Sequence, residues 1–210
     1  MRIALINGSP KRKDSASGAL LEDLKDCFGN KAEIDEIGFH VPVLLENALE
    51  MLEKSDVWIF SYPLYVDGIP GHLLACLAQL ETACLHNPNR RIYGIVNCGF
   101  YEGVQADLAL AILQNWCEKV GYIWGSGIGI GGGGCLAMMP KMESGKGPKA
   151  PIDKAFRILA EQVLNHVSVE NVYVSVAFPR AMYKMAAQMG WRQLIKANGG
   201  KASDLGKQPE

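Results

Sequence analysis

Short β-type runs alternate with longer helical patterns along most of this chain, and few folds accommodate that order. Runs rich in Val, Ile and aromatic residues are expected as strands at 2–7, 32–37, 56–62, 91–97 and 122–130. Apolar residues at helical spacing indicate helices at 16–28, 43–52, 70–84, 103–120 and 152–167. Strands and helices in alternation form a parallel sheet with helices on both faces. We therefore predict an α/β domain over 1–167, built on a doubly wound five-stranded parallel sheet.

Composition narrows the class of protein. Apolar residues make 49% of the 210 residues and charged residues 20%, values that exclude a disordered chain. The net charge of −1 gives no basis for nucleic-acid binding. The six cysteines form no Cys-x-x-Cys pair, so neither a zinc site nor a redox dithiol is predicted, and we expect no bound metal.

Targeting signals are not expected. Residues 1–8 carry four apolar residues in a row, too few for the core of a signal peptide, and we expect a cytoplasmic protein with reduced thiols. Residues 120–140 are uncharged, but eight of these 21 residues are glycine. Glycine disfavours helix, so we predict no transmembrane segment.

Residues 168–210 form a basic C-terminal extension. No Asp or Glu occurs from 171 to 203, whereas five Lys and Arg do. Met182, Met185 and Met189 fall on one face of a predicted helix. We expect this helix to pack on its own domain or on a partner subunit; the alternative is a basic amphipathic helix at a membrane surface.

The loops that follow the strands are the expected binding segments, because ligands of open parallel sheets bind beyond the carboxyl ends of the strands. The loop after the first strand runs into a helix start, which offers free N–H groups to an anion. Serines and cations along it (Ser9, Ser15, Ser17, Lys11) predict phosphate binding; the alternative is that the serines only cap the helix.

Two further loops predict a flat, phosphorylated ligand. Residues 61–71 are aromatic and rich in turn residues, which suits contact with a heterocycle. Gly99 and Gly103 follow the fourth strand and allow close backbone approach. Gly127-x-Gly129-x-x-Gly132 matches a dinucleotide-binding pattern, but a polar loop follows it instead of a helix, so we do not interpret it as one.

The sequence resembles the flavodoxin-like NAD(P)H-dependent FMN reductases and quinone reductases. INGSPKRKDSAS resembles their FMN-phosphate loop, and YPLYVDGIPGHLLACLAQL their isoalloxazine loop and following helix. FPRAMYKMAAQMGWRQLIKANG is similar to a C-terminal extension found in one branch. Two departures are the basic phosphate loop and Val66, where relatives often carry a larger aromatic residue.

The resemblance implies one FMN per subunit, strand order 2-1-3-4-5, and a homodimer. The FMN phosphate would be held by Ser9, Lys11, Ser15 and Ser17. The ring would be contacted by Pro63, Leu64, Tyr65, Val66, Asp67 and Gly68, and its pyrimidine side by Asn97, Cys98, Gly99, Phe100 and Glu102. Because the flavin carries the redox chemistry, no catalytic side chain is predicted.

The expected activity is transfer of electrons from NADH or NADPH through FMN to a small acceptor: a quinone, a nitro or azo compound, or free flavin. The alternatives are a flavodoxin-type electron carrier and a non-enzymatic binding module, which fold alone cannot separate. Cys98 is interpreted as an apolar filler rather than a nucleophile. His72 is interpreted as a surface residue rather than a substrate contact, and Asp67 either shapes an Asp-Gly turn or bonds the flavin.

Overall fold

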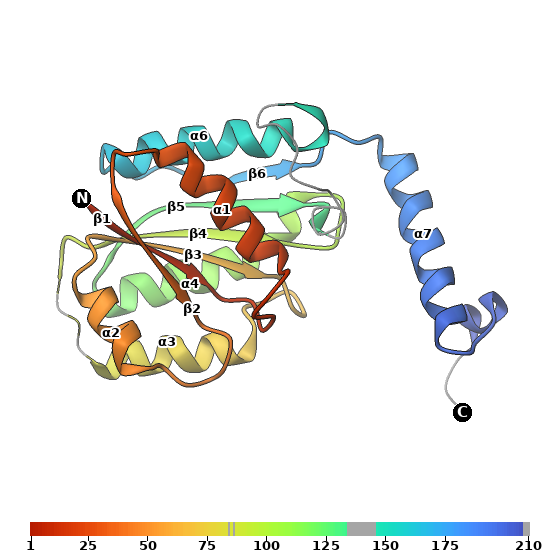
Figure 1. Ribbon diagram of the computed structural model, residues 1–210, viewed down its shortest axis with the longest axis horizontal. Coiled ribbons are helices and arrows are strands. Elements are labelled where there is room, and N and C mark those ends of the chain that lie inside the picture. Colours follow the sequence, from red (N-terminus) through yellow and green to blue (C-terminus); the bar gives the residue numbers. More distant parts are fainter. Residues whose placement is uncertain (84, 86, 134–145, 208–210) are drawn as a thin grey trace. The chain divides into compact units, whose positions relative to one another are not determined.

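A six-stranded parallel sheet forms the centre of the unit Met1–Ala177 (Figure 1). The structure is a computed structural model that describes residues 1–83, 85, 87–133 and 146–207. The strands are β1 (Arg2–Asn7), β2 (Glu33–Gly38), β3 (Val57–Pro63), β4 (Arg91–Asn97), β5 (Ile123–Gly131) and β6 (Val172–Ser175). Their order is β2-β1-β3-β4-β5-β6, so the predicted order of the first five strands is confirmed. The prediction of five strands is wrong, because β6 pairs in parallel with β5.

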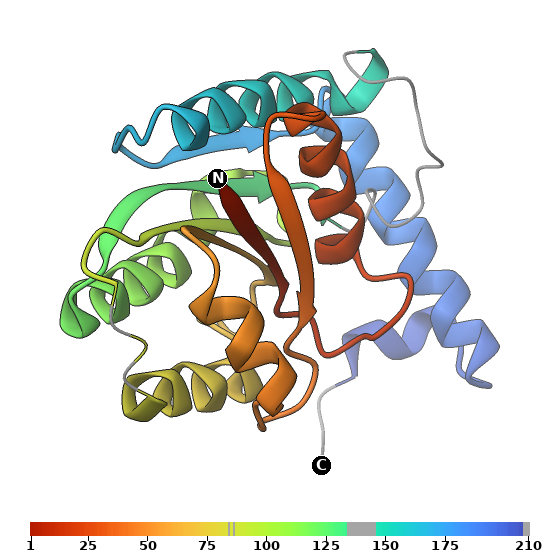
Figure 2. The same ribbon diagram turned by 60° about the vertical axis from the view of Figure 1, so that its left-hand side comes forward.

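Helices cover both faces of the sheet. The helices α1 (Ala16–Phe28) and α6 (Ala150–Leu164) lie over one face, and α2 (Glu46–Glu53), α3 (Gly71–Ala83) and α4 (Asp107–Val120) over the other (Figures 1 and 2). Side chains alternate between the faces along a strand. Trp58 and Phe60 of β3 therefore pack in the core beneath α2, α3 and α4, whereas Ile59 points to the opposite face; all three are fully buried.

The glycines of β5 make room for the segment that follows β4. A Cβ atom at Gly131 would lie 2.0 Å from the Tyr101 carbonyl oxygen, and one at Gly129 would lie 2.5 Å from the Gly103 carbonyl oxygen. The Gly127-x-Gly129-x-x-Gly132 pattern thus serves close packing. The predicted helix 103–120 begins as a 3-10 turn, η1 (Gly103–Ala106), where this packing occurs, and continues as α4.

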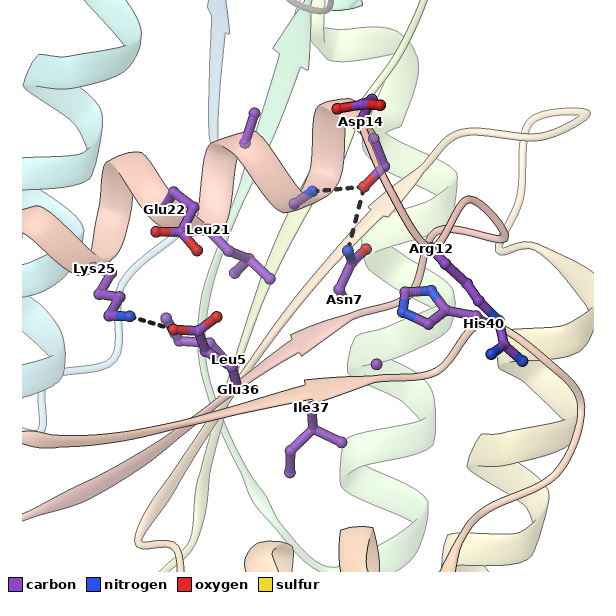
Figure 3. A pocket seen from close by; sticks show the side chains of 14 residues that line it. Leu5, Asn7, Arg12, Asp14, Leu21, Glu22, Lys25, Glu36, Ile37 and His40 are labelled. Atoms are coloured by element: carbon purple, nitrogen blue, oxygen red, sulfur yellow. Dashed lines mark hydrogen bonds and ion pairs between the residues drawn. The ribbon is translucent and has the colours of Figure 1, made fainter. Parts of the chain in front are cut away.

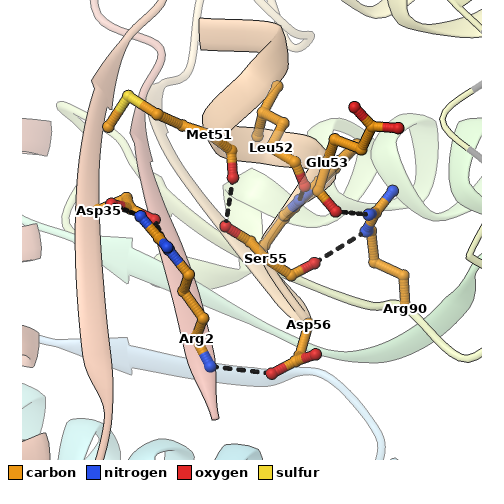
Figure 4. Close-up of polar contacts among 9 residues, drawn as sticks. Arg2, Asp35, Met51, Leu52, Glu53, Ser55, Asp56 and Arg90 are labelled. Carbon is orange, nitrogen blue, oxygen red and sulfur yellow. Dashed lines mark hydrogen bonds and ion pairs between the residues drawn. The ribbon is translucent and has the colours of Figure 1, made fainter. Parts of the chain in front are cut away.

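A buried arginine lies at the end of the sheet where the strands begin (Figure 4). Arg90 is 1% exposed and donates to the carbonyl oxygens of Glu53, Ser55 and Leu85 at 3.0–3.2 Å. Its guanidinium also lies 4.4 Å from the centre of the Trp58 ring, a cation–π contact. Arg90 therefore supplies hydrogen bonds to the end of α2 and to the two loops beside it.

The chain divides into two units, Met1–Ala177 and Phe178–Glu210. The second unit holds α7 (Arg180–Ala197) and the 3-10 turn η3 (Ala202–Gly206). None of the described residues of α7 is buried. Within the part of the chain that the structure describes, no helix combines the length and the apolar character needed to cross a bilayer.

Candidate functional site

Hydrogen bonds join the loops at the carboxyl edge of the sheet. The Gly8 amide donates to the Ser61 carbonyl oxygen at 2.8 Å, which links the loop after β1 to β3. The Leu64 amide donates to the Asn97 carbonyl oxygen at 2.9 Å, which links the loops after β3 and β4. The strands β2 and β3 lie on opposite sides of β1, so the direction in which successive strands join the sheet reverses at β1. Ligands of such sheets bind beyond the carboxyl ends of the strands at this reversal. All three predicted loops therefore belong to one region.

The loop after β1 is held by its own side chains. The Asn7 side chain accepts from the Ser9 amide at 3.1 Å and donates to Ser15 Oγ at 3.2 Å. Ser9 Oγ in turn accepts from the Lys11 amide at 3.2 Å. Sequence reasoning overlooked Asn7, although Asn before Gly-Ser is a known signal of a side-chain-stabilised turn. The loop is thus shaped before any ligand binds.

Ser15 is the N-cap of α1 and keeps a donor for a ligand. Its Oγ accepts from the Gly18 amide at 3.0 Å and from Asn7 Nδ2. A hydroxyl can accept two hydrogen bonds and donate one, so the Ser15 hydroxyl can still donate its proton to a ligand. The first helical turn adds the N–H groups of Ala16 and Ser17, which have no acceptor inside the helix. These donors can bind an anion at the start of α1.

The sequence predicts that the Ser17 hydroxyl contacts a phosphate, whereas in the structure this hydroxyl is buried and bonded to another side chain. The side chain is 1% exposed, and its Oγ donates to Asn97 Oδ1 at 2.8 Å. Its carbonyl oxygen accepts from Ser61 Oγ at 3.1 Å. The Ser17 hydroxyl therefore links α1 to the end of β4, and the Ser17 carbonyl oxygen links it to the end of β3. Only the backbone N–H of Ser17 is left to face a ligand.

A cavity of about 460 Å³ opens beside this loop, between α1 and β2 (Figure 3). Asn7, Ser15, Arg12 and His40 line it near the loop, and the ion pair between Lys25 and Glu36 lies farther along. Among the described residues that line it, none comes from the loops after β3 and β4. The cavity thus adjoins the predicted phosphate loop and not the predicted ring contacts.

The loop after β3 ends in a tight two-residue turn. Tyr65 and Gly68 exchange backbone hydrogen bonds of 3.1 and 3.0 Å, and Val66 and Asp67 between them have φ values of 49° and 56°. Two successive positive φ values define a type I′ turn, and its two central residues here are Val66 and Asp67. Asp67 thus occupies the second central position of this turn, and Gly68 follows it. Val66 is a genuine outlier there, because a β-branched side chain disfavours this conformation.

Apolar side chains are exposed around this turn. Val66 is fully exposed at the tip, Tyr65 is 49% exposed, and Phe100 in the next loop is 54% exposed. The turn lies against α4, since a Cβ atom at Gly68 would be 3.6 Å from Ile112 Cδ1. Large apolar groups that stay exposed at one edge of a folded domain indicate a binding surface.

The loop after β4 combines buried and open positions. Asn97 is 8% exposed and Cys98 2%, whereas a Cβ atom at Gly99 would meet no atom within 4 Å. The Cys98 thiol faces the carbonyl oxygens of Phe100 and Glu102 at 3.8 and 3.6 Å. Burial raises the pKa of this thiol, which keeps it protonated and unsuited to nucleophilic attack. Pro63 pairs with Asn97 across the two strands.

Two histidines contact the loop after β1, and the sequence did not predict either contact. His40, after β2, and His72, in the first turn of α3, contact the backbone of Ser9 and Gly8. His72 is partly exposed, and its Nε2 lies 3.1 Å from the Gly8 carbonyl oxygen. Contacts across 31 and 64 residues leave no local pattern in a sequence.

Comparison with known proteins identifies the fold. No protein-family model matches the sequence, and no curated protein is detectably similar to it. An NADH:FMN oxidoreductase in its apo form is 15% identical with a TM-score of 0.59, over 80% of this chain and 91% of that one. A flavodoxin from Streptococcus pneumoniae TIGR4 is 10% identical with a TM-score of 0.56, over 80% of this chain and 100% of that one. An azoreductase from Bacillus anthracis str. Sterne is 15% identical with a TM-score of 0.51, over 79% and 99%.

At these identities the likeness shows the fold alone, which is flavodoxin-like. The described chain departs from the predicted architecture in the sixth strand. The second unit, Phe178–Glu210, follows the last strand of the sheet in sequence.

Proposed function

We propose that this chain is an FMN-dependent oxidoreductase of the NAD(P)H-dependent FMN reductase and quinone reductase type. It would pass electrons from NADH or NADPH to a small acceptor such as a quinone, a nitro or azo compound, or free flavin. The observation that carries the proposal is the hydrogen-bonded junction of three loops at the reversal point of the sheet. One loop offers donors to an anion, and the other two expose aromatic and glycine surface to a flat ring.

The residues present fit an FMN phosphate. The Ser15 hydroxyl proton and the N–H groups of Ala16 and Ser17 are donors, and Lys11 and Arg12 add exposed positive charge. Hydrogen bonds to a charged group contribute about 1.5–3 kcal/mol each, so a few of them hold a phosphate. Ser9 would act by stabilising the loop, because its side chain is only 4% exposed and accepts a hydrogen bond from the Lys11 amide.

The residues present also fit a flavin ring. Tyr65 and Phe100 would supply aromatic surface, Leu64 and Val66 apolar contact, and Gly99 an open approach to the backbone. The remaining assigned contacts are Pro63, Asp67, Gly68, Asn97, Cys98 and Glu102. When bound, FMN supplies two-electron redox chemistry, and this chain would orient the ring and limit its access to water. The domain that does this is assigned to residues 1–167, with 168–210 as the basic extension.

A homodimer is part of this proposal. Val104, Leu108 and Ile112 form a stripe along η1 and α4 that is 38–61% exposed and adjoins the turn at Val66. An exposed apolar stripe beside a binding site favours burial against another subunit. Light scattering at micromolar concentration should then give about twice the monomer mass of 22.9 kDa, and Leu108→Asp should reduce it to the monomer. A monomeric wild-type protein would count against this assignment.

The absorption spectrum of the purified protein tests the function. After incubation with FMN and removal of free cofactor, we expect flavin bands at near stoichiometric occupancy that NADH or NADPH bleaches without air. Ser15→Ala should weaken FMN retention more than riboflavin retention, while Ser168→Ala, at the other edge of the sheet, should leave both unchanged. Bands that neither nucleotide bleaches would favour an electron carrier, and a colourless protein would reject both flavin roles and favour a binding module.

A further inference from the structure

Two histidines donate to consecutive carbonyl oxygens of the loop after β1. His40 Nδ1 lies 2.7 Å from the Ser9 carbonyl oxygen, and His72 Nε2 lies 3.1 Å from the Gly8 carbonyl oxygen. A carbonyl oxygen can only accept, so the proton is on Nδ1 of His40 and on Nε2 of His72. The two rings come from different elements, and together they hold the loop at neighbouring peptide groups.

The two peptide groups whose carbonyl oxygens contact the histidines have only one N–H donor between them. The Gly8–Ser9 peptide has one N–H, which points away from its carbonyl oxygen and donates to Asn7 Oδ1 at 3.1 Å. The next peptide, Ser9–Pro10, has no N–H at all because of the proline. This part of the loop therefore offers two acceptors beside a place where an anion is proposed to bind. A carbonyl oxygen that turned toward that anion would repel it.

We propose that His40 and His72 are positioning residues for phosphate binding. By holding the carbonyl oxygens of Ser9 and Gly8, they keep two acceptors from facing the phosphate and fix the course of the loop into α1. This proposal rests on the proposed FMN site, but the holding of the loop is a property of the protein without ligand and can be measured separately.

The position of His40 depends on a glycine. A Cβ atom at Gly38, the last residue of β2, would lie 2.2 Å from His40 Nε2 and 2.6 Å from Cδ2, so the imidazole ring rests where a side chain would be. Gly38 does not have a positive φ, and alanine is compatible with its backbone. Gly38→Ala should therefore displace the His40 ring from Ser9 without removing it. In Figure 3, Arg12 and His40 lie together at this end of the cavity.

The first experiment compares FMN with riboflavin, which lacks the phosphate. Fluorescence titration should show FMN affinity about 3- to 10-fold lower in His40→Leu, His72→Leu and Gly38→Ala, the change expected for one lost hydrogen bond, with little change for riboflavin. His40→Asn and His72→Gln should restore most of the FMN affinity, because these amides place an N–H near the same ring nitrogen. His166→Asn is the matched control, since His166 lines a pocket at the other edge of the sheet and Asn tolerates its φ of 53°.

The second experiment needs no flavin. Hydrogen exchange followed by mass spectrometry on the protein without ligand should show faster exchange of the amides in residues 8–17 in the three disruptive variants, and unchanged exchange in the control. Equal losses of FMN and riboflavin affinity, or no change in either, would overturn the phosphate role. Unchanged exchange in residues 8–17 would overturn the holding of the loop, even if the wild-type protein bound no flavin and the proposed function failed.

Discussion

Arg90→Met should be among the most damaging substitutions outside the candidate site. The guanidinium is buried and donates to the carbonyl oxygens of Glu53 and Ser55 at 3.1 and 3.2 Å (Figure 4). The carbonyl oxygen of Leu85, its third acceptor, would keep a hydrogen bond from the Tyr122 hydroxyl at 2.8 Å. The substitution therefore leaves the buried carbonyl oxygen of Ser55 and the partly buried carbonyl oxygen of Glu53 without the donor that Arg90 provided.

The magnitude follows from these contacts. A buried carbonyl oxygen without a partner, here that of Ser55, costs about 1–3 kcal/mol, and the partly buried carbonyl oxygen of Glu53 costs less because water can reach it. Loss of the cation–π contact with Trp58, at 4.4 Å, adds about 2 kcal/mol in a desolvated setting. Methionine carries no charge to desolvate, which offsets part of the loss. We expect the free energy of unfolding to fall by about 3–5 kcal/mol, a large part of the 5–15 kcal/mol typical of a domain.

Urea titration followed by circular dichroism measures this loss. Arg90→Lys keeps the charge but cannot reproduce the planar fork, so an intermediate loss is expected. Lys31→Met removes an exposed cation and should change the free energy of unfolding by no more than about 0.5 kcal/mol. A loss below about 1 kcal/mol in Arg90→Met, at an unchanged denaturant slope, would refute the reasoning from unsatisfied carbonyl oxygens.

Three further predictions concern the site and the core. Ser17→Ala should lower the free energy of unfolding by about 1–3 kcal/mol, because Asn97 Oδ1 loses its donor. It should also reduce the FMN and riboflavin affinities equally in fluorescence titrations. A loss confined to FMN would show that the Ser17 hydroxyl binds the phosphate. Val66→Gly should raise the free energy of unfolding, measured by urea titration, by about 0.5–1 kcal/mol. The relief of the positive φ at this position exceeds the entropy cost of glycine, and no buried contact is lost. A lower free energy of unfolding would contradict this prediction. Burial raises the pKa of the Cys76 thiol to about 11 from the ordinary 9.0, so the unfolded chain loses this proton first and stability should fall as pH rises from about 9 to 11. Cys76→Ala should make that pH dependence shallower in urea titrations, and an unchanged slope would count against it.

The sheet and its helices could be predicted in large part from the sequence, because their signals are local. The run at β3 is apolar throughout, and the spacing of Leu20, Leu24 and Phe28 marks the buried face of α1. The strand β6 escaped prediction for a physical reason. Its four residues are stabilised by pairing with β5, more than 40 residues earlier, and an isolated strand this short has no stability of its own.

The candidate site divides in the same way. The cap at Ser15 follows from residue type and position, since it depends on a backbone group three residues away. A turn beside Asp67 also follows, although its central pair is Val66-Asp67 and not the Asp67-Gly68 pair that the sequence favours. The direction of the Ser17 hydroxyl and the two histidines on the loop after β1 do not. The sequence by itself determined which segments become strands, helices and turns, because those choices depend on neighbours along the chain. Only the tertiary structure decided which side chains hold the loops together, because such contacts exist once the sheet has brought distant residues to one edge.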